Sequence, residues 1–351
     1  MNVAAESPLL ELCAGTVSVR GGVRPAAELI SDVSVALHRN EIVGLVGESG
    51  CGKSTTARAL LGLLPLSAGE LRLHGERVGA DKSALRASVQ AIFQNPVASS
   101  NPKRSLLDSV AEPLRVRGHG DKAERRRRAL EELDRVGLGA HVARQRPQDV
   151  SGGQCQRAAI ARATILRPEV LVCDEPVSSL DVSIQAQIIE LLAELRQETG
   201  VSMLFISHDL SVVASLCDRT AVMYAGRIVE RGPTQAVART ARHPYTVILH
   251  DAEPADPAAP KTEPRLKIVE ARDDIDARQL PGCRFAALCP LVTEVCTARF
   301  PELTELDPHH QVACCHPLAL GTSEGPPPDQ VSDRTSAGLN LNTELSSNRG
   351  E

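Results

Sequence analysis

The chain has 351 residues, a formal net charge of -5 and 42% hydrophobic residues, which allows one large folded unit and a smaller one. Its basic residues are dispersed, so neither nucleic acid nor an anionic membrane surface is favoured as the main partner. No apolar run reaches about 18 residues, and the first residues lack the pattern of a signal peptide. We therefore expect a cytosolic chain that does not cross a bilayer by itself.

Apolar runs that predict strands alternate with helical patterns up to about His250. The first clear strand is expected at residues 42–46, followed by a helix at residues 54–63. Because this alternation is typical of a parallel sheet, we predict an α/β fold with a helical insertion at about residues 96–167. Further strands are expected at residues 71–75, 89–93, 170–173, 201–206 and 220–224, and further helices at residues 122–136, just after Ser151 and at residues 184–197.

The composition changes at about residue 250, where we place a domain boundary. Residues 1–250 are predicted to form the main domain, and residues 251–264 a Pro/Ala linker without a packing pattern. Residues 265–320 are expected to form a small extension, because five of the ten cysteines gather there. The Gly, Pro, Ser and Asn content of residues 321–351 predicts a disordered tail.

Residues 47–54 match the phosphate-loop pattern at every required position. Three glycines let backbone amides converge on phosphate oxygens, Lys53 neutralises phosphate charge, and the Ser54 hydroxyl is suited to ligate Mg2+. A chance glycine-rich turn is the alternative, but the strand before and the helix after disfavour it. Nucleotide binding is therefore predicted for Gly47, Ser49, Gly50, Cys51, Gly52, Lys53, Ser54 and Thr55.

Asp174 and Glu175 end an apolar strand at residues 170–173. Two carboxylates at such a position are costly unless a cation or a bound water accounts for them, which disfavours a merely solvated turn. Asp174 is suited to hold the Mg2+ shell, and Glu175 to orient and deprotonate an attacking water. We therefore predict that Glu175 is catalytic.

A run of Ser-Gly-Gly-Gln at residues 151–154 lies between these two motifs. A serine cap and small residues at a helix start expose amides to an anion, although an ordinary helix cap has the same pattern. With the phosphate loop before it and the Asp-Glu strand end after it, the run resembles the signature of ABC transporter ATP-binding subunits. Val150 departs from the family, which usually has leucine there, and we regard the apolar exchange as tolerable.

The resemblance implies further roles for residues of this chain. It implies that ATP and Mg2+ bind, with the metal at Ser54, Gln94 and Asp174, and that His208 is a catalytic switch touching the γ-phosphate. Asp181 corresponds to a loop that crosses to a partner subunit. The signature Ser151, Gly152, Gly153 and Gln154 would close over ATP held by a second ABC ATPase, identical or paralogous.

Four segments narrow the resemblance to the oligopeptide/dipeptide permease ATPases, a branch that includes nickel importers. This resemblance implies an N-terminal antiparallel β-subdomain and an ATP-hydrolysing importer subunit at the cytoplasmic face of the membrane. Its partners would be two membrane permease subunits and, indirectly, an extracytoplasmic solute-binding protein. Nucleic acid is not expected as a partner. Peptides are the preferred solute; nickel or another small solute and a soluble, non-transport ATPase are the alternatives. The segments are residues 92–102, 179–183, 224–230 and 243–246.

The cysteines of residues 265–320 suit soft metals, zinc or iron-sulfur, although the lack of a Cys-x-x-Cys pair weakens a zinc ribbon. Members of the branch with a similar segment carry a 4Fe-4S cluster, and unligated buried thiols are the alternative. Cys51, Cys155 and Cys173 are interpreted as packing residues. The resemblance implies Cys283, Cys289, Cys296 and Cys315 as cluster ligands, with Cys315 preferred to Cys314 because the family pattern ends in Cys-His.

Two further features bear on ligand choice. Most family members stack adenine on an aromatic residue before the phosphate loop, whereas the first aromatic residue here is Phe93. Arg20 or Arg24 could stack on the base instead, although both resemble ordinary surface arginines, so weaker or less base-selective binding is a hypothesis. The four arginines at 125–128 lie among acidic residues at helical spacing, which favours a salt-bridged surface over nucleic-acid binding.

Overall fold

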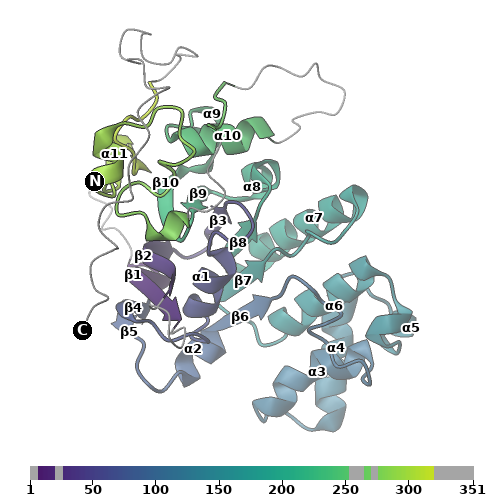
Figure 1. Ribbon diagram of the computed structural model, residues 1–351. Helices are drawn as coiled ribbons and strands as arrows, with labels where there is room; N and C mark the ends of the chain where they lie inside the picture. Colours follow the sequence, from purple (N-terminus) through teal and green to yellow (C-terminus); the bar gives the residue numbers. More distant parts are fainter. Residues whose placement is uncertain (1–6, 20–26, 253–264, 270–275, 320–351) are drawn as a thin grey trace, which may run out of the picture.

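The computed structural model describes residues 7–19, 27–252, 265–269 and 276–319. Its centre is an eight-stranded sheet with the order β11-β12-β10-β9-β3-β8-β7-β6 (Figure 1). The five strands at one end are parallel and almost wholly buried, which explains why their sequences are continuous apolar runs. These strands are β3 (Ile42–Val46), β6 (Val89–Ile92), β7 (Val170–Asp174), β8 (Ser202–Ser207) and β9 (Arg219–Tyr224). The predicted parallel sheet is confirmed.

A second, four-stranded antiparallel sheet lies at the N-terminal side, with the order β2-β1-β4-β5. Its apolar side chains share a core with helix α1 (Lys53–Leu60), which follows the phosphate loop. The antiparallel β-subdomain expected from the family resemblance is therefore present. Its strands are β1 (Leu10–Val19), β2 (Ala27–Leu37), β4 (Ala68–Leu73) and β5 (Glu76–Arg77), and the short helix α2 (Ser83–Ser88) precedes β6.

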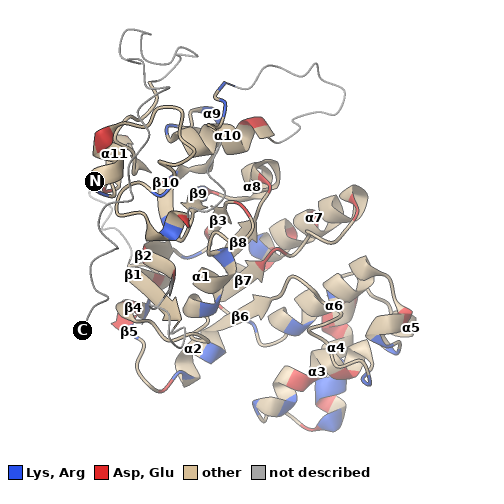
Figure 2. Ribbon diagram, in the orientation of Figure 1, with Lys and Arg blue, Asp and Glu red and all other residues tan. Residues whose placement is uncertain are grey.

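Helices fill the chain between β6 and β7, as the sequence predicts. Ser105 caps α3 by accepting a hydrogen bond from the Asp108 amide, and Asp121 caps α4 in the same way. Arg127 of α4 pairs with Glu124 at 2.7 Å and also with Glu131, so the predicted salt-bridged face is confirmed (Figure 2). The helices are α3 (Leu106–Val116), α4 (Lys122–Arg135), α5 (Ala140–Ala143), the 3-10 turn η1 (Pro147–Asp149) and α6 (Gly152–Thr164).

The C-terminal part of the described chain extends the central sheet rather than forming a sheet of its own. Strand β10 (Arg227–Pro233) pairs antiparallel with β9, and β12 (His310–Val312) pairs with β10. β11 (Thr304–Asp307) completes the edge. The domain boundary near residue 250 stays a prediction, and the predicted tail lies outside the described residues. The remaining helices are α7 (Val182–Thr199), α8 (Leu210–Leu216), α9 (Thr234–Arg239), α10 (Pro244–Ala252), η2 (Ala277–Gln279) and α11 (Glu294–Ala298).

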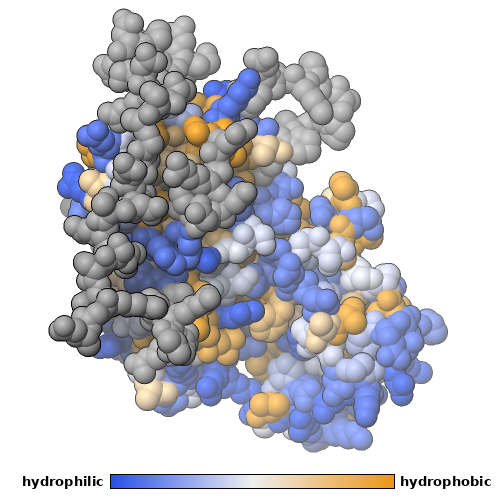
Figure 3. Space-filling model, viewed as in Figure 1, coloured by the Kyte–Doolittle hydropathy of each residue, from blue (hydrophilic) through white to orange (hydrophobic). Residues whose placement is uncertain are grey.

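Within the described residues, no helix has the length and apolarity that a membrane crossing requires. The face in Figure 3 is largely hydrophilic over the helical insertion, and single apolar residues interrupt it. Among the exposed apolar residues are Phe93 and Val97, which lie just after β6.

Candidate active site

The phosphate loop joins the end of β3 to the start of α1. Gly47 has φ +152°, and a Cβ at this position would lie 2.1 Å from the Met223 carbonyl oxygen, so only glycine fits there. The Lys53 ammonium is buried, with the residue 5% exposed. Its Nζ donates hydrogen bonds to the carbonyl oxygens of Gly47 at 2.7 Å and Glu48 at 3.0 Å. The loop therefore curls around the ammonium group, which becomes its fixed positive centre.

The predicted magnesium residues Ser54 and Asp174 lie together. The Ser54 hydroxyl donates to Asp174 Oδ1 at 3.0 Å, so the helix after the phosphate loop meets the end of β7. Burial raises the pKa of the Asp174 carboxyl, and the hydrogen bond from Ser54 opposes that rise. A hydroxyl and a carboxylate are oxygen ligands of the kind that Mg2+ prefers. The chemistry of this pair fits the metal.

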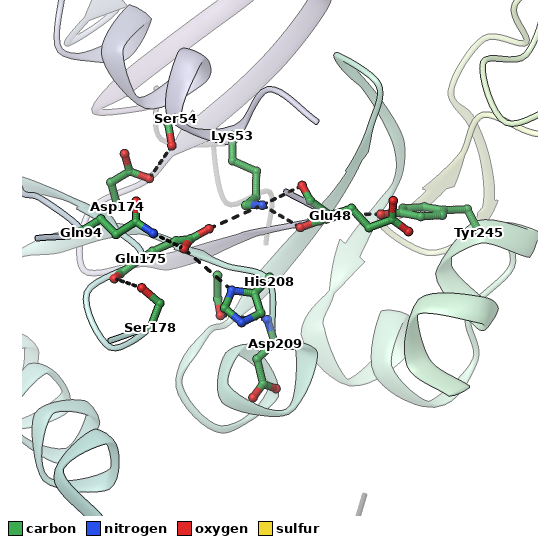
Figure 4. A network of polar contacts seen from close by, with 12 residues as sticks. Glu48, Lys53, Ser54, Gln94, Asp174, Glu175, Ser178, His208, Asp209 and Tyr245 are labelled. Atoms are coloured by element: carbon green, nitrogen blue, oxygen red, sulfur yellow. Dashed lines mark hydrogen bonds and ion pairs between the residues drawn. The ribbon is translucent and has the colours of Figure 1, made fainter. Parts of the chain in front are cut away.

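Glu175 lies at the point where the predicted catalytic residues converge (Figure 4). Its Oε2 accepts a hydrogen bond from Gln94 Nε2 at 2.8 Å and lies 3.8 Å from His208 Nδ1. Its Oε1 lies 3.7 Å from Lys53 Nζ. Glu175 also has φ +48°, in the left-handed region, which is typical of residues held for function. Three separate segments thus place polar groups around one carboxylate.

The other predicted residues of the loop line its turns. Cys51 is buried, and its amide donates to the Glu48 carbonyl at 3.2 Å. Gly52 caps α1 in the left-handed conformation, with φ 115°. Ser49 and Gly50 are exposed, and Thr55 is half-buried in the first turn of α1. Cys155 and Cys173 are buried as predicted for packing residues.

The Ser-Gly-Gly-Gln run caps and begins helix α6. Ser151 and Gln154 form a capping box, because each side chain bonds the other residue's amide. Gly153 packs so closely that a Cβ would lie 2.7 Å from Ile184 Cγ2. Asp181 caps the neighbouring helix α7 through the Ile184 amide at 3.0 Å. Among the described residues, no hydrogen bond or ion pair joins residues 151–154 to the cluster around Glu175.

Two contacts to the phosphate loop were not predicted from the sequence. The Glu48 amide donates to the Tyr245 hydroxyl at 3.0 Å, and the Arg278 guanidinium donates to the Gly50 carbonyl. These partners are 197 and 228 residues apart in sequence, and neither Tyr245 nor Arg278 carries a local nucleotide-binding pattern. The candidate base-stacking residues Arg20 and Arg24 lie outside the described residues.

The C-terminal cysteines line one small pocket. Its volume is about 10 Å³, which is about the smallest that can hold one water molecule, and its wall includes His243 and Phe285. Within the described residues, no three His, Cys, Asp or Glu side chains are arranged to hold a metal ion. The type and number of donors match the predicted cluster, but the structure does not arrange them to hold a metal. The thiols belong to Cys283, Cys289, Cys296, Cys314 and Cys315, which we call the cysteine pocket.

Comparison with known proteins agrees with this geometry. Residues 30–178 match the ABC transporter family, and residues 229–296 match the C-terminal region of oligopeptide/dipeptide transporters. A Brucella abortus protein that is named as a peptide import ATP-binding protein is 42% identical over 299 residues. The match covers 84% of this chain and 88% of that protein. The oligopeptide transport ATP-binding protein OppF of Haemophilus influenzae is 41% identical over 292 residues, covering 81% and 87%.

Solved structures show the same relationship. A dimeric ATP-binding cassette in a post-hydrolysis state, bound to ADP and Pi, superposes with a TM-score of 0.59 at 28% identity and covers 64% of this chain and 98% of its own. The cbiO1 protein of Clostridium perfringens, part of an ABC transporter complex, gives 0.59 at 26% identity and covers 66% and 91%. On its matched segments and its similarity to these relatives, the chain belongs to the ATP-binding proteins of the ABC transporter family and carries the C-terminal region of its oligopeptide/dipeptide branch.

Proposed function

We propose that this chain is the ATP-hydrolysing subunit of an importer that takes up peptides through separate membrane subunits. The convergence of Gln94, Lys53 and His208 on Glu175 is the observation that carries the ATPase proposal. The peptide substrate is supported by the names of relatives that are 41–42% identical over most of the chain. Uptake of nickel or another small solute is the alternative within the branch.

Each residue of the site has a chemical task in this proposal. Backbone amides of the phosphate loop and the Lys53 ammonium bind the phosphates. Ser54, Asp174 and Gln94 would hold Mg2+, which when bound supplies charge neutralisation at the phosphates. Glu175 accepts the proton of the attacking water as ADP and phosphate separate. His208, 58% exposed at its side chain, would contact the γ-phosphate.

The signature residues 151–154 are proposed to serve ATP bound to a second ATPase subunit. The exposed cap at Ser151 and the absence of described contacts to Glu175 support a role outside the chain's own site. The similar cassette bound to ADP and Pi is a dimer. Two membrane permease subunits would dock near residues 94–107, where Phe93 and Val97 expose apolar side chains. A solute-binding protein would then act indirectly, and the chain would lie peripherally at the cytoplasmic face of the membrane.

The catalytic assignment is tested by Glu175→Gln, which keeps the size of the side chain but removes the base. We expect ATP binding to persist and turnover to fall by about 100-fold or more. Glu169→Gln is the matched control, since Glu169 precedes β7 while Glu175 follows it, and Glu169 bonds only Arg39 and His74 through its side chain within the described residues. Turnover near the wild-type value in Glu175→Gln would refute the assigned base.

A 4Fe-4S cluster in the cysteine pocket is proposed on the number and type of its donors. Burial raises the pKa of Cys283 to about 11 and of Cys289 to about 12, so both thiols stay protonated until a cation displaces the proton. Anaerobic purification followed by visible absorption and iron and sulfide analysis tests the proposal. Cys296→Ser should lower the iron content, while Cys13→Ser, outside the pocket, should not. A colourless, iron-free wild-type protein would defeat it.

Two questions about ligands need separate measurements. Replacing Cys314 or Cys315 singly by serine would show which of them the iron requires. Comparing ATP and GTP affinity tests the hypothesis of reduced base selectivity, and a strong preference for ATP would count against it. Co-purification with membrane subunits separates an importer from a soluble ATPase, the remaining alternative class.

A further inference from the structure

The phosphate loop receives support from parts of the chain that follow the central ATPase motifs. Tyr245, in the first turn of α10, accepts a hydrogen bond from the Glu48 amide at 3.0 Å. Arg278, in η2, donates a hydrogen bond to the Gly50 carbonyl. The loop is therefore held at two positions two residues apart, once through an N–H group and once through a carbonyl group.

The loop needs such support at these positions. Gly50 has φ +80°, and a Cβ built there would meet no described atom within 4 Å, so packing does not fix this turn. A phosphate loop binds through the directions of its backbone amides, and groups ordered before the ligand arrives lower the entropic cost of binding. Hydrogen bonds at the Glu48 amide and the Gly50 carbonyl limit the backbone conformations of the loop, and so the directions of its remaining amides.

Tyr245 is itself rigidly placed. It is 1% exposed, and its ring lies 4.6 Å from the Tyr224 ring and 5.5 Å from the Phe285 ring, measured between centroids. Its amide donates to His243 Nδ1 at 3.1 Å. Burial raises the pKa of the Tyr245 hydroxyl, which therefore stays neutral and available to the Glu48 amide. A hydroxyl fixed on a packed ring is a precise acceptor.

We propose that Tyr245 and Arg278 are positioning residues that hold the phosphate loop in its nucleotide-binding shape. The C-terminal part of the chain thereby contributes to ATP affinity without touching the nucleotide. This inference rests on the proposed ATP site. It concerns residues that no phosphate-loop pattern contains, because both act through the backbone of residues 48 and 50.

Tyr245→Phe is the sharpest test, because it removes one oxygen and leaves the aromatic packing intact. Tyr224→Phe is the matched control, since the Tyr224 hydroxyl has no hydrogen-bond partner within the described part of the chain. We expect Tyr245→Phe to raise the KM and the Kd for ATP about fivefold to tenfold, the value of one hydrogen bond. The kcat should stay within about twofold, because the lost contact orders the loop equally for substrate and transition state. Tyr224→Phe should change neither constant.

Arg278 is tested by rescue. Arg278→Met removes the donor and should weaken ATP binding by a similar factor, while Arg278→Lys, which keeps a donor and the charge, should recover part of the affinity. Arg265→Met is the control for loss of a C-terminal cation, because Arg265 pairs with Asp251 at 2.9 Å rather than with the loop. Loss of binding in Arg278→Met that Arg278→Lys does not relieve would indicate general damage and overturn the assignment of Arg278.

The outcomes separate this inference from the proposed ATP site. If Lys53→Ala abolishes ATP binding while Tyr245→Phe and Arg278→Met bind like the wild type, the positioning role is wrong and the ATP site stands. If Lys53→Ala also binds ATP normally, the proposed site itself falls. Should Arg278→Met fail to fold, Tyr245→Phe alone decides, since its packing is unchanged.

Discussion

Glu230→Gln should destabilise the protein strongly, because Glu230 joins three parts of the C-terminal region. The residue is 0% exposed and lies on β10. Its Oε1 accepts from the Arg242 amide at 2.7 Å and from His310 Nε2 at 2.8 Å, and its Oε2 accepts from the His243 amide at 2.9 Å. The carboxylate thus holds the start of α10 and strand β12 to the central sheet.

The magnitude follows from the geometry of the amide that replaces the carboxylate. Glutamine has one oxygen and one NH2 group, so either orientation of Gln at position 230 directs a donor at the backbone N–H of Arg242 or of His243. At least one buried donor is left unpaired, at about 1–3 kcal/mol, and the remaining bonds lose their charge assistance. We expect the free energy of unfolding to fall by about 2–4 kcal/mol.

Urea unfolding followed by circular dichroism measures this loss. Asp307→Asn is the control, because Asp307 also links β11 to Arg242, at 2.7 Å, but its side chain is 35% exposed. The pair is partly solvated, and asparagine keeps an oxygen that can accept from Arg242, so this variant should lose only about 1 kcal/mol. Equal losses in the two variants, or a Glu230→Gln protein within about 0.5 kcal/mol of wild type, would refute the reasoning.

Three further predictions concern other parts of the structure. Burial lowers the pKa of His243 to about 4, so between that pH and about 6.5 the unfolded chain binds more protons than the folded chain. The free energy of unfolding should therefore fall by up to about 3 kcal/mol as the pH drops through this window. Urea titrations at several pH values should show that His243→Gln lacks this pH-dependent loss. Gly153→Ala should cost about 1–3 kcal/mol through its clash with Ile184, and a double-mutant cycle with Ile184→Ala should relieve most of the cost; additive losses would contradict this. Anaerobic loading of the cysteine pocket with iron and sulfide should release more protons in a pH-stat than the sulfide alone gives up, because Cys283 and Cys289 are protonated beforehand; iron uptake without this extra release would oppose it.

The catalytic cluster was predictable because the phosphate loop and the Asp-Glu strand end carry local signals, whereas Gln94 and His208 were assigned through the family resemblance. The phosphate loop has its glycine spacing, and Asp174 and Glu175 follow an apolar strand. Strand order then brings the carboxyl ends of parallel strands to one edge, where Gln94 and His208 also lie. The phosphate-binding and carboxylate residues of the site could therefore be identified from short motifs, and the parallel sheet brings those motifs together.

The C-terminal contacts could not be predicted in this way. His310 and Glu230 are 80 residues apart, and a buried histidine and glutamate on short strands have no spacing that identifies them as partners. One signal was available for β10, since Ala225 and Gly226, both with positive φ, form a hairpin turn between apolar runs. The addition of β11 and β12 to the same sheet depends on edge pairing, which leaves little trace in sequence.

The first turn of α10 and the residue before it connect three features of the molecule. The His243 amide bonds Glu230, the His243 ring lines the cysteine pocket, and the Tyr245 hydroxyl bonds the phosphate loop. Since His243 Nδ1 accepts from the Tyr245 amide, its Nε2 carries the proton of the neutral ring, and this buried atom has no hydrogen-bond partner within the described residues. An unpaired donor at the wall of the cysteine pocket is costly unless something there accepts its hydrogen.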